Sequence, residues 1–177
     1  YRRTQHRIRV LPAASELVRG RLESAFGLDT RRVPVTGEPR TDTLSQGTAA
    51  DRRLAARARL GALLADAPGV GGDTPIVLYA PTWRDGAPDP APPTGVELAG
   101  LQTLLAETGA VLLVRSHHLG GGGGPLEGPR VHGFGSEVVA DITPLLPGID
   151  ALVTDYSSLA FDAALAGVPT LFHAPDL

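Results

Sequence analysis

Residues 151–158 read Ala151-Leu152-Val153-Thr154-Asp155-Tyr156-Ser157-Ser158, a short apolar run that ends in a string of polar side chains. The apolar run predicts a buried strand over 151–153, because strands of a parallel sheet are covered on both faces and are apolar throughout. The residues that follow predict a helix over 157–165. Its expected interior face consists of Leu159, Phe161, Ala164 and Leu165. A strand that passes directly into a helix is typical of α/β proteins.

Two further apolar runs end in polar strings of the same kind. Residues 75–80 predict a strand that leads into Thr82-Trp83-Arg84-Asp85, and residues 111–114 predict one that leads into Arg115-Ser116-His117-His118. Between and around these strands the pattern predicts helices over 49–66 and 97–107, a helical turn over 141–146, and strands over 130–132 and 170–172. This alternation predicts the α/β class, with a Rossmann-like, doubly wound parallel sheet.

The first part of the chain has a different pattern. Short strands are expected over 8–12 and 33–35, followed by a loop over 36–42. Between the two strands, Ser15 is a candidate N-cap of a helix that ends at Gly27. The helix over 49–66 is rich in alanine and arginine, both good helix formers, and its expected apolar side consists of Leu54, Leu60, Leu63 and Leu64.

The composition excludes several kinds of chemistry. Among its 177 residues the chain has no cysteine and no lysine, and all 16 basic residues are arginine. Disulfides, thiolate metal sites, cysteine nucleophiles, a P-loop lysine and a Schiff-base lysine are therefore excluded. No histidine and carboxylate residues show metal-ligand spacing, and no glycine-rich dinucleotide fingerprint is present, so no metal or cofactor is expected. No apolar run approaches the roughly 20 residues of a membrane span.

Charge is distributed unevenly along the chain. Residues 1–60 hold 13 arginines and 6 acidic residues, a formal charge of +7, whereas residues 61–177 hold 3 arginines and 13 acidic residues, a formal charge of −10. The favoured interpretation of the basic part is a solvated helix face formed by Arg52, Arg53, Arg57 and Arg59. The alternative is a surface that meets an anionic membrane or polymer.

The three polar strings are the candidate functional site, because ligands of parallel α/β sheets bind at the carboxyl ends of the strands. Ser157 and Ser158 start a helix and are candidates for phosphate binding, or for a plain N-cap. Arg84 is suited to bidentate phosphate contact, or to a surface ion pair. His117 is a candidate for proton transfer or phosphate contact, or for a loop histidine satisfied by backbone.

Taken together, the strings resemble the CDP-glycerol:poly(glycerophosphate) glycerophosphotransferases, the teichoic acid polymerase family of the GT-B fold. The order and spacing of the matching stretches hold over most of the chain. These stretches are Val35-Thr36-Gly37-Glu38-Pro39-Arg40-Thr41-Asp42, Leu78-Tyr79-Ala80-Pro81-Thr82-Trp83-Arg84-Asp85, Val114-Arg115-Ser116-His117, Asp141-Ile142-Thr143, Asp150 to Ser158, Phe161-Asp162, Gly167-Val168-Pro169-Thr170 and Pro175-Asp176-Leu177.

The resemblance implies that residues 1–44 are the end of an N-terminal domain and the crossover. Residues 45–177 would then be a nucleotide-donor-binding domain, the C-terminal half of a GT-B architecture, truncated at its C-terminus. The implied donor is CDP-glycerol or CDP-ribitol, and the implied acceptor is a polyol-phosphate polymer; no nucleic acid partner is expected. The donor diphosphate would be bound by Arg84, Thr82, Arg115, Asp155, Ser157 and Ser158, with His117 as the catalytic residue. The implied location is the cytoplasmic face of the membrane, as a peripheral protein. Attachment would come from the missing domain or from the arginine-rich start of the chain, and both alternatives remain open.

The sequence also departs from the family pattern. A Trp-His-Gly string, whose histidine is often assigned as the base, is absent, and His118 stands where the family commonly has proline. The chain is therefore expected to be an internal piece that does not turn over alone. Two alternatives remain open: another GT-B enzyme that uses a UDP-sugar, and a non-catalytic nucleotide-binding module.

Overall fold

The structure of the chain is a computed structural model that describes residues 7–82, 96–115 and 128–174. The chain divides into two compact units, Tyr1–Thr43 and Leu44–Leu177. None of the helices in the described ranges combines the length and apolarity that a bilayer crossing requires.

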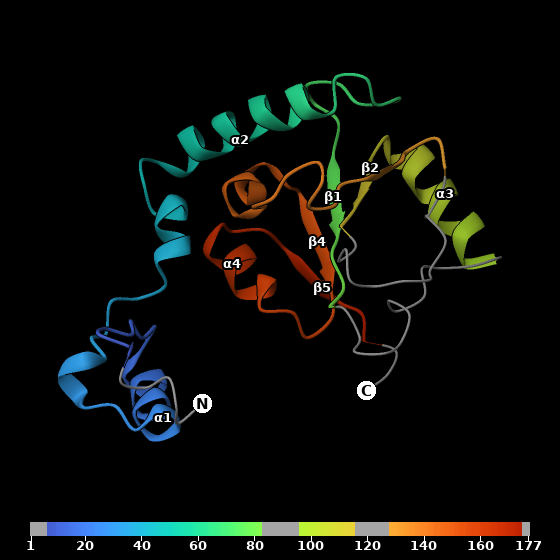
Figure 1. The fold of residues 1–177 in the computed structure, drawn as a ribbon. Coiled ribbons are helices and arrows are strands. Elements are labelled where there is room, and N and C mark those ends of the chain that lie inside the picture. Colours follow the sequence, from blue (N-terminus) through green and yellow to red (C-terminus); the bar gives the residue numbers. More distant parts are fainter. Residues whose placement is uncertain (1–6, 83–95, 116–127, 175–177) are drawn as a thin grey trace. The chain divides into compact units, whose positions relative to one another are not determined.

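The second unit is built on a five-stranded parallel sheet (Figure 1). The strands are β1 (Ile76–Tyr79), β2 (Val111–Val114), β3 (Val131–Gly133), β4 (Ala151–Thr154) and β5 (Thr170–Phe172). Their order across the sheet is β3-β2-β1-β4-β5, with Leu78 of β1 paired with Leu113 of β2 and with Leu152 of β4. The predicted α/β class with a Rossmann-like parallel sheet is therefore confirmed.

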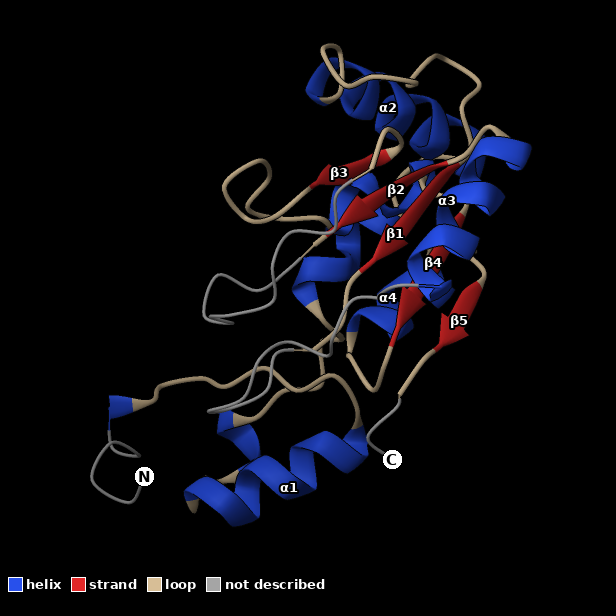
Figure 2. Cartoon of the chain, turned by 90° about the vertical axis from the view of Figure 1, so that its right-hand side faces the viewer, coloured by secondary structure: helices blue, strands red, loops and turns tan. Residues whose placement is uncertain are grey.

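Helices cover both faces of this sheet, as expected for a doubly wound fold (Figures 1 and 2). Helix α3 (Val96–Thr108) covers one face, and α4 (Leu159–Leu165) covers the other together with the 3₁₀ helix η4 (Thr143–Gly148) and α2 (Ala49–Leu63). Successive strand residues point to opposite sides, so Leu78 and Leu113 join the core under α4, whereas Tyr79 and Leu112 join the core under α3. The apolar character of the strands follows from this double coverage.

Helix α2 begins at a capping box and packs on η4. The Thr48 hydroxyl accepts a hydrogen bond from the Asp51 N–H, and the Asp51 side chain accepts one from the Thr48 N–H. Leu60 is fully buried, which stabilises the fold by about 2 kcal/mol. A Cβ at Gly148 would lie 2.7 Å from Leu60 Cδ1 and 3.0 Å from Ala56 Cβ, so only glycine allows this close approach.

The predicted apolar side of α2 was wrong at two of its four residues. Leu54 and Leu63 are exposed, and Ala56 is buried in their place together with Leu60 and Leu64. The reason is that the helix presents a narrow stripe to η4, in which a small residue fits against the backbone of Gly148. The helix also ends at Leu63, three residues before the predicted end.

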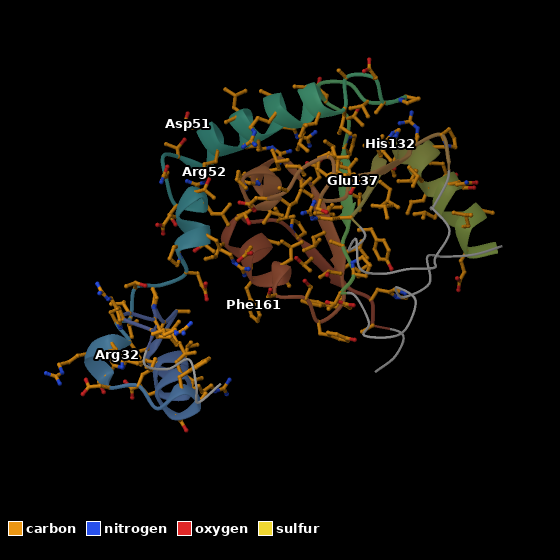
Figure 3. The ribbon with its side chains drawn as sticks, in the orientation of Figure 1. Arg32, Asp51, Arg52, His132, Glu137 and Phe161 are labelled. Carbon is orange, nitrogen blue, oxygen red and sulfur yellow. The ribbon has the colours of Figure 1, made fainter. Side chains whose placement is uncertain are left out.

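The predicted interior of α4 was confirmed at Leu159, which packs against the core. It was wrong at Phe161, Ala164 and Leu165, which are exposed. Phe161 is 75% exposed and Leu165 is exposed as well, while Asp162 and Ala163 are buried. Figure 3 shows the Phe161 side chain pointing away from the sheet. Small Ala163 packs into the core under α4, and a helix of only seven residues has too few apolar positions for its pattern to indicate the buried face.

In the first unit, helix α1 (Glu16–Phe26) agrees with the prediction. Ser15 Oγ accepts a hydrogen bond from the Val18 N–H at 3.3 Å, and Gly27 ends the helix in the left-handed conformation with φ 62°. The 3₁₀ helices η2 (Thr30–Arg32) and η3 (Pro39–Leu44) follow, so the predicted loop over 36–42 is partly helical.

The strands predicted over 8–12 and 33–35 were wrong. The described residues there form only one parallel bridge, between Ala13 and Val35, supported by hydrogen bonds from the Leu11 N–H to the Arg32 carbonyl and from the Ala13 N–H to the Pro34 carbonyl. Pro12 and Pro34 have no N–H group to donate to a ladder, which explains why the pairing does not extend.

Candidate functional site

The strand order defines a switch point between β1 and β4. From β1 the chain proceeds through β2 to β3 on one side, and from β4 it proceeds to β5 on the other side. In doubly wound sheets, ligands bind outside the carboxyl ends of the strands at the position where the order reverses. The residues that directly follow Tyr79 of β1 and Thr154 of β4 lie at this position.

A buried carboxylate connects these two strand ends. The Thr82 N–H donates to both carboxylate oxygens of Asp155, with N···O distances of 3.0 Å, and the Thr82 hydroxyl donates to Asp155 Oδ1 at 2.6 Å. Asp155 is only 1% exposed. A buried carboxylate is costly unless it is hydrogen-bonded, and bonds to an ionised acceptor are among the stronger ones. The structure therefore brings together two of the predicted site residues.

The same strand ends are connected one step closer to the sheet. The Thr154 hydroxyl donates to the Ala80 carbonyl at 2.6 Å, and the Ala80 N–H donates to the Val153 carbonyl at 3.0 Å. Thr154 is fully buried. The pattern of the sequence did not predict this role of Thr154, although a threonine directly before the aspartate at the end of a buried strand is a signal for such a bond.

The two predicted serines occupy the turn between β4 and α4. Ser157 Oγ accepts a hydrogen bond from the Leu159 N–H at 3.3 Å, so Ser157 caps the first turn. Ser158 holds the N-cap position, but its side chain makes no capping hydrogen bond and is exposed. Both hydroxyls therefore follow Asp155 closely at the carboxyl end of β4.

Arg115 follows β2 and holds the segment after β3. Its guanidinium donates to the carbonyls of Phe134 at 3.2 Å, Val139 at 2.9 Å and Ala140 at 3.0 Å. Burial lowers the pKa of Arg115, and the nearby carboxylates of Glu137 and Asp141 partly oppose that effect. The bonds to three carbonyls give Arg115 a structural role at this edge, and its predicted contact with a diphosphate stays a prediction.

Two predicted site residues, Arg84 and His117, lie outside the described residues. Within the ranges that are described, no group of three or more histidine, aspartate or glutamate side chains is arranged to hold a metal ion.

A second charged cluster lies at the opposite, amino-terminal edge of the sheet. Asp150 Oδ1 accepts a hydrogen bond from Arg53 Nη2 at 2.6 Å, and Asp150 Oδ2 accepts one from Arg57 Nη2 and one from the Ile76 N–H at 2.7 Å. Burial acts to raise the pKa of Asp150, but the bonds from Ile76, Arg53 and Arg57 outweigh it, so the pKa is lowered.

This cluster corrects the prediction of a solvated helix face at Arg57, whose side chain is only 17% exposed. Arg53 and Arg59 are exposed, as predicted, although Arg53 also pairs with Asp150. Arg57 also donates to the Thr74 carbonyl at 2.7 Å, and Arg53 to the Pro147 carbonyl at 3.2 Å. Both arginines therefore attach α2 to the start of β1 and β4. Arg52, labelled in Figure 3, donates to the carbonyls of Gln46 and Gly47 just before the helix.

A family model described as CDP-glycerol:poly(glycerophosphate) glycerophosphotransferase matches residues 2–177. The chain belongs to this family. It is 32% identical over 160 residues to a teichoic acid poly(glycerol phosphate) polymerase of Staphylococcus epidermidis, a match that covers 87% of this chain and 21% of the relative. It is 31% identical over 166 residues to a teichoic acid glycerol-phosphate transferase of Staphylococcus aureus, covering 88% of this chain and 38% of the relative.

A solved structure of the wall teichoic acid polymerase TagF, from a variant soaked with CDPG, is similar to this chain with a TM-score of 0.74. The two are 27% identical, and the match covers 99% of this chain and 41% of that one. The resemblance to the glycerophosphotransferase family is thus confirmed. The chain spans between about a fifth and two fifths of the length of these relatives.

Proposed function

We propose that this chain supplies the donor-binding part of an enzyme that transfers glycerol phosphate from CDP-glycerol to a growing poly(glycerol phosphate) chain. The observation that carries the proposal is the match of 99% of the chain to TagF, a polymerase whose crystals were soaked with CDPG. Support also comes from the switch point between β1 and β4, the usual position of a nucleotide in a doubly wound sheet.

The reaction is a phosphoryl transfer. The terminal hydroxyl of the acceptor attacks the phosphorus that carries glycerol, a new P–O bond forms, the P–O bond to CMP breaks, and the hydroxyl proton passes to a base. Such reactions depend mainly on positioning and on stabilisation of phosphate charge. In this proposal the hydroxyls of Ser157 and Ser158 and the guanidinium of Arg84 bind the diphosphate.

His117 is proposed to stand at the same edge, where an imidazole can donate to a phosphate oxygen or transfer a proton. The general base that accepts the acceptor proton is expected on residues that this chain does not contain. The purified chain is therefore expected to bind the donor without releasing CMP. As part of a polymerase that uses a cytidine nucleotide, it is proposed to act at the cytoplasmic face of the membrane.

Saturation-transfer NMR on the chain tests the proposal, because the method detects the weak binding expected of half a site. The ligands are CDP-glycerol, CDP-ribitol, CMP and a UDP-sugar. The variants Arg84→Ala and Ser157→Ala are each compared with a matched exposed control, Arg59→Ala and Ser24→Ala. Transfer to the cytidine ligands that is lost in the site variants and kept in the controls supports the proposal.

Two outcomes would count against it. A preference for the UDP-sugar would favour a sugar-transferring GT-B enzyme. Absence of transfer to every ligand from a folded chain would favour a module without donor-binding function. Comparison of CDP-glycerol with CDP-ribitol decides which alcohol the site prefers.

A further inference from the structure

We infer that Asp155 and Thr82 do not contact the donor but position the groups that do. In this assignment the Asp155 carboxylate fixes the position of the segment after β1 relative to the segment after β4. The family resemblance implied that both residues contact the ligand, and this assignment gives them a positioning role instead. The inference deepens the proposed function and rests on it.

Asp155 and Thr82 are hydrogen-bonded to each other. Both oxygens of Asp155 accept hydrogen bonds from Thr82, and Oδ1 accepts from the N–H and the hydroxyl together. With 1% of its surface exposed, Asp155 offers almost nothing for a ligand to touch. The N–H and the hydroxyl of Thr82 both donate to this carboxylate.

Electrostatic repulsion also disfavours contact between Asp155 and the donor. A carboxylate and a diphosphate are both anionic, and like charges within about 4–6 Å disfavour one another. Direct contact between Asp155 and a CDP-alcohol would weaken binding unless a cation lay between them. Donation from Thr82 gives the carboxylate the partners that a buried charge requires. The buried charge of Asp155 is therefore better suited to fixing the position of Thr82 than to contacting the donor.

In the sequence, the two residues stand next to the proposed phosphate-binding groups. Thr82 directly precedes the segment that contains Arg84, and Asp155 precedes Ser157 by two residues. One carboxylate thus connects the two segments that carry the proposed phosphate-binding groups. A displacement of about 1 Å between catalytic or binding groups can cost roughly a hundredfold in rate. Loss of the connection is therefore expected to weaken donor binding although neither residue touches the donor.

The experiment uses four variants of the 177-residue chain. Thr82→Val keeps the side-chain shape and removes the hydroxyl bond to Asp155. Thr82→Ser retains the hydroxyl and is the conservative rescue. Asp155→Asn removes the charge and one acceptor. Thr154→Val is the matched control, since it removes a buried hydroxyl bond of 2.6 Å between the same two strand ends, one step closer to the sheet.

Two properties are measured on each variant: the dissociation constant for CDP-glycerol, and the amide NMR spectrum without ligand. Thr82→Val and Asp155→Asn are expected to weaken donor binding about tenfold or more, as loss of a charge-assisted hydrogen bond would. Thr82→Ser restores binding, and Thr154→Val binds normally despite a lower unfolding midpoint. Without ligand, Thr82→Val and Asp155→Asn both shift the amide signals of Ser157 and Ser158, and Thr82→Ser does not.

The outcomes separate this inference from the proposed function. Donor binding unchanged in Thr82→Val, or weakened equally in Thr154→Val, would overturn the inference and leave the proposed function intact. If the unmodified chain binds no cytidine ligand, the proposed function fails. The ligand-free spectra still decide whether the pair couples the two segments: unchanged Ser157 and Ser158 signals in Thr82→Val would refute that coupling.

Discussion

Asp150→Asn is expected to destabilise the second unit by about 3 kcal/mol at neutral pH. The substitution removes the charge that holds Arg53 and Arg57 and weakens the acceptor for the Ile76 N–H. The pair with Arg53 is half-exposed and contributes about 0–1 kcal/mol. The pair with the more buried Arg57 and the bond from the Ile76 N–H contribute roughly 1–2 kcal/mol each.

Chemical denaturation at several pH values measures this contribution. Since the folded-state pKa of Asp150 is lowered from 3.8, its stabilisation is complete at pH values above the unfolded-state pKa and is lost as the pH falls through the folded-state pKa. The difference between the unmodified chain and Asp150→Asn should therefore be large at pH 7 and should shrink below about pH 4. Asp66→Asn, the same chemical change at an exposed position of the same unit, is the control.

The stabilising role of the Asp150 carboxylate would be refuted if Asp150→Asn unfolded at the same denaturant concentration as the unmodified chain at pH 7. It would also be refuted if the difference grew as the pH fell. A further check is Arg57→Gln combined with Asp150→Asn: because the two residues share one interaction, the double variant should lose less stability than the two single variants added together.

Three further predictions concern packing. Gly148→Ala should lower the free energy of unfolding by about 1–3 kcal/mol, because the added methyl group overlaps α2. Gly61→Ala should raise it by about 0.5–1 kcal/mol, because this helix position has open space around it. Denaturation curves that rank the two variants in the opposite order would contradict the packing of α2 on Gly148. Arg115→Gln should speed amide exchange in residues 134–140, since three carbonyls lose their donor, and unchanged exchange there would contradict the structural role of the guanidinium. Phe161→Ala should change stability by less than about 1 kcal/mol, and a loss of 3 kcal/mol or more, typical of a core phenylalanine, would show that Phe161 is buried.

Much of the sheet could be predicted from sequence, because buried parallel strands are apolar on both sides. Such a strand can be located without knowing which strand it pairs with. Residues 76–79 and 111–114 are of this kind. The orientation of α4 could not be predicted in the same way. It depends on the packing of Ala163 and on the interactions that compensate the burial of the Asp162 carboxylate. The apolar side chain of Phe161 indicates a buried position, but Phe161 is exposed. At Pro12 and Pro34, the apolar pattern indicated strands but the missing N–H groups prevented them.

The sequence predicted the edge of the sheet at which the candidate site lies, but not which side chains contact one another there. Polar residues after apolar strands indicate the carboxyl ends of a parallel sheet, and this places Thr82, Arg115 and Asp155 at one edge. That Thr82 and Asp155 meet depends on β1 and β4 being neighbours, which the hydrophobic pattern does not encode. The attachment of Arg115 to carbonyls of residues 134–140 likewise depends on the path of the chain after β3.

The proposed donor site lies at the carboxyl ends of β1 and β4, where the diphosphate of a CDP-alcohol is expected to bind. A crystal structure of this chain with CDP-glycerol tests it most directly. Phosphate oxygens are expected within hydrogen-bonding distance of Ser157 or Ser158, and no phosphate contact to Asp155 is expected. A donor bound at the opposite edge of the sheet, beside Arg53 and Arg57, would rule out the proposed site.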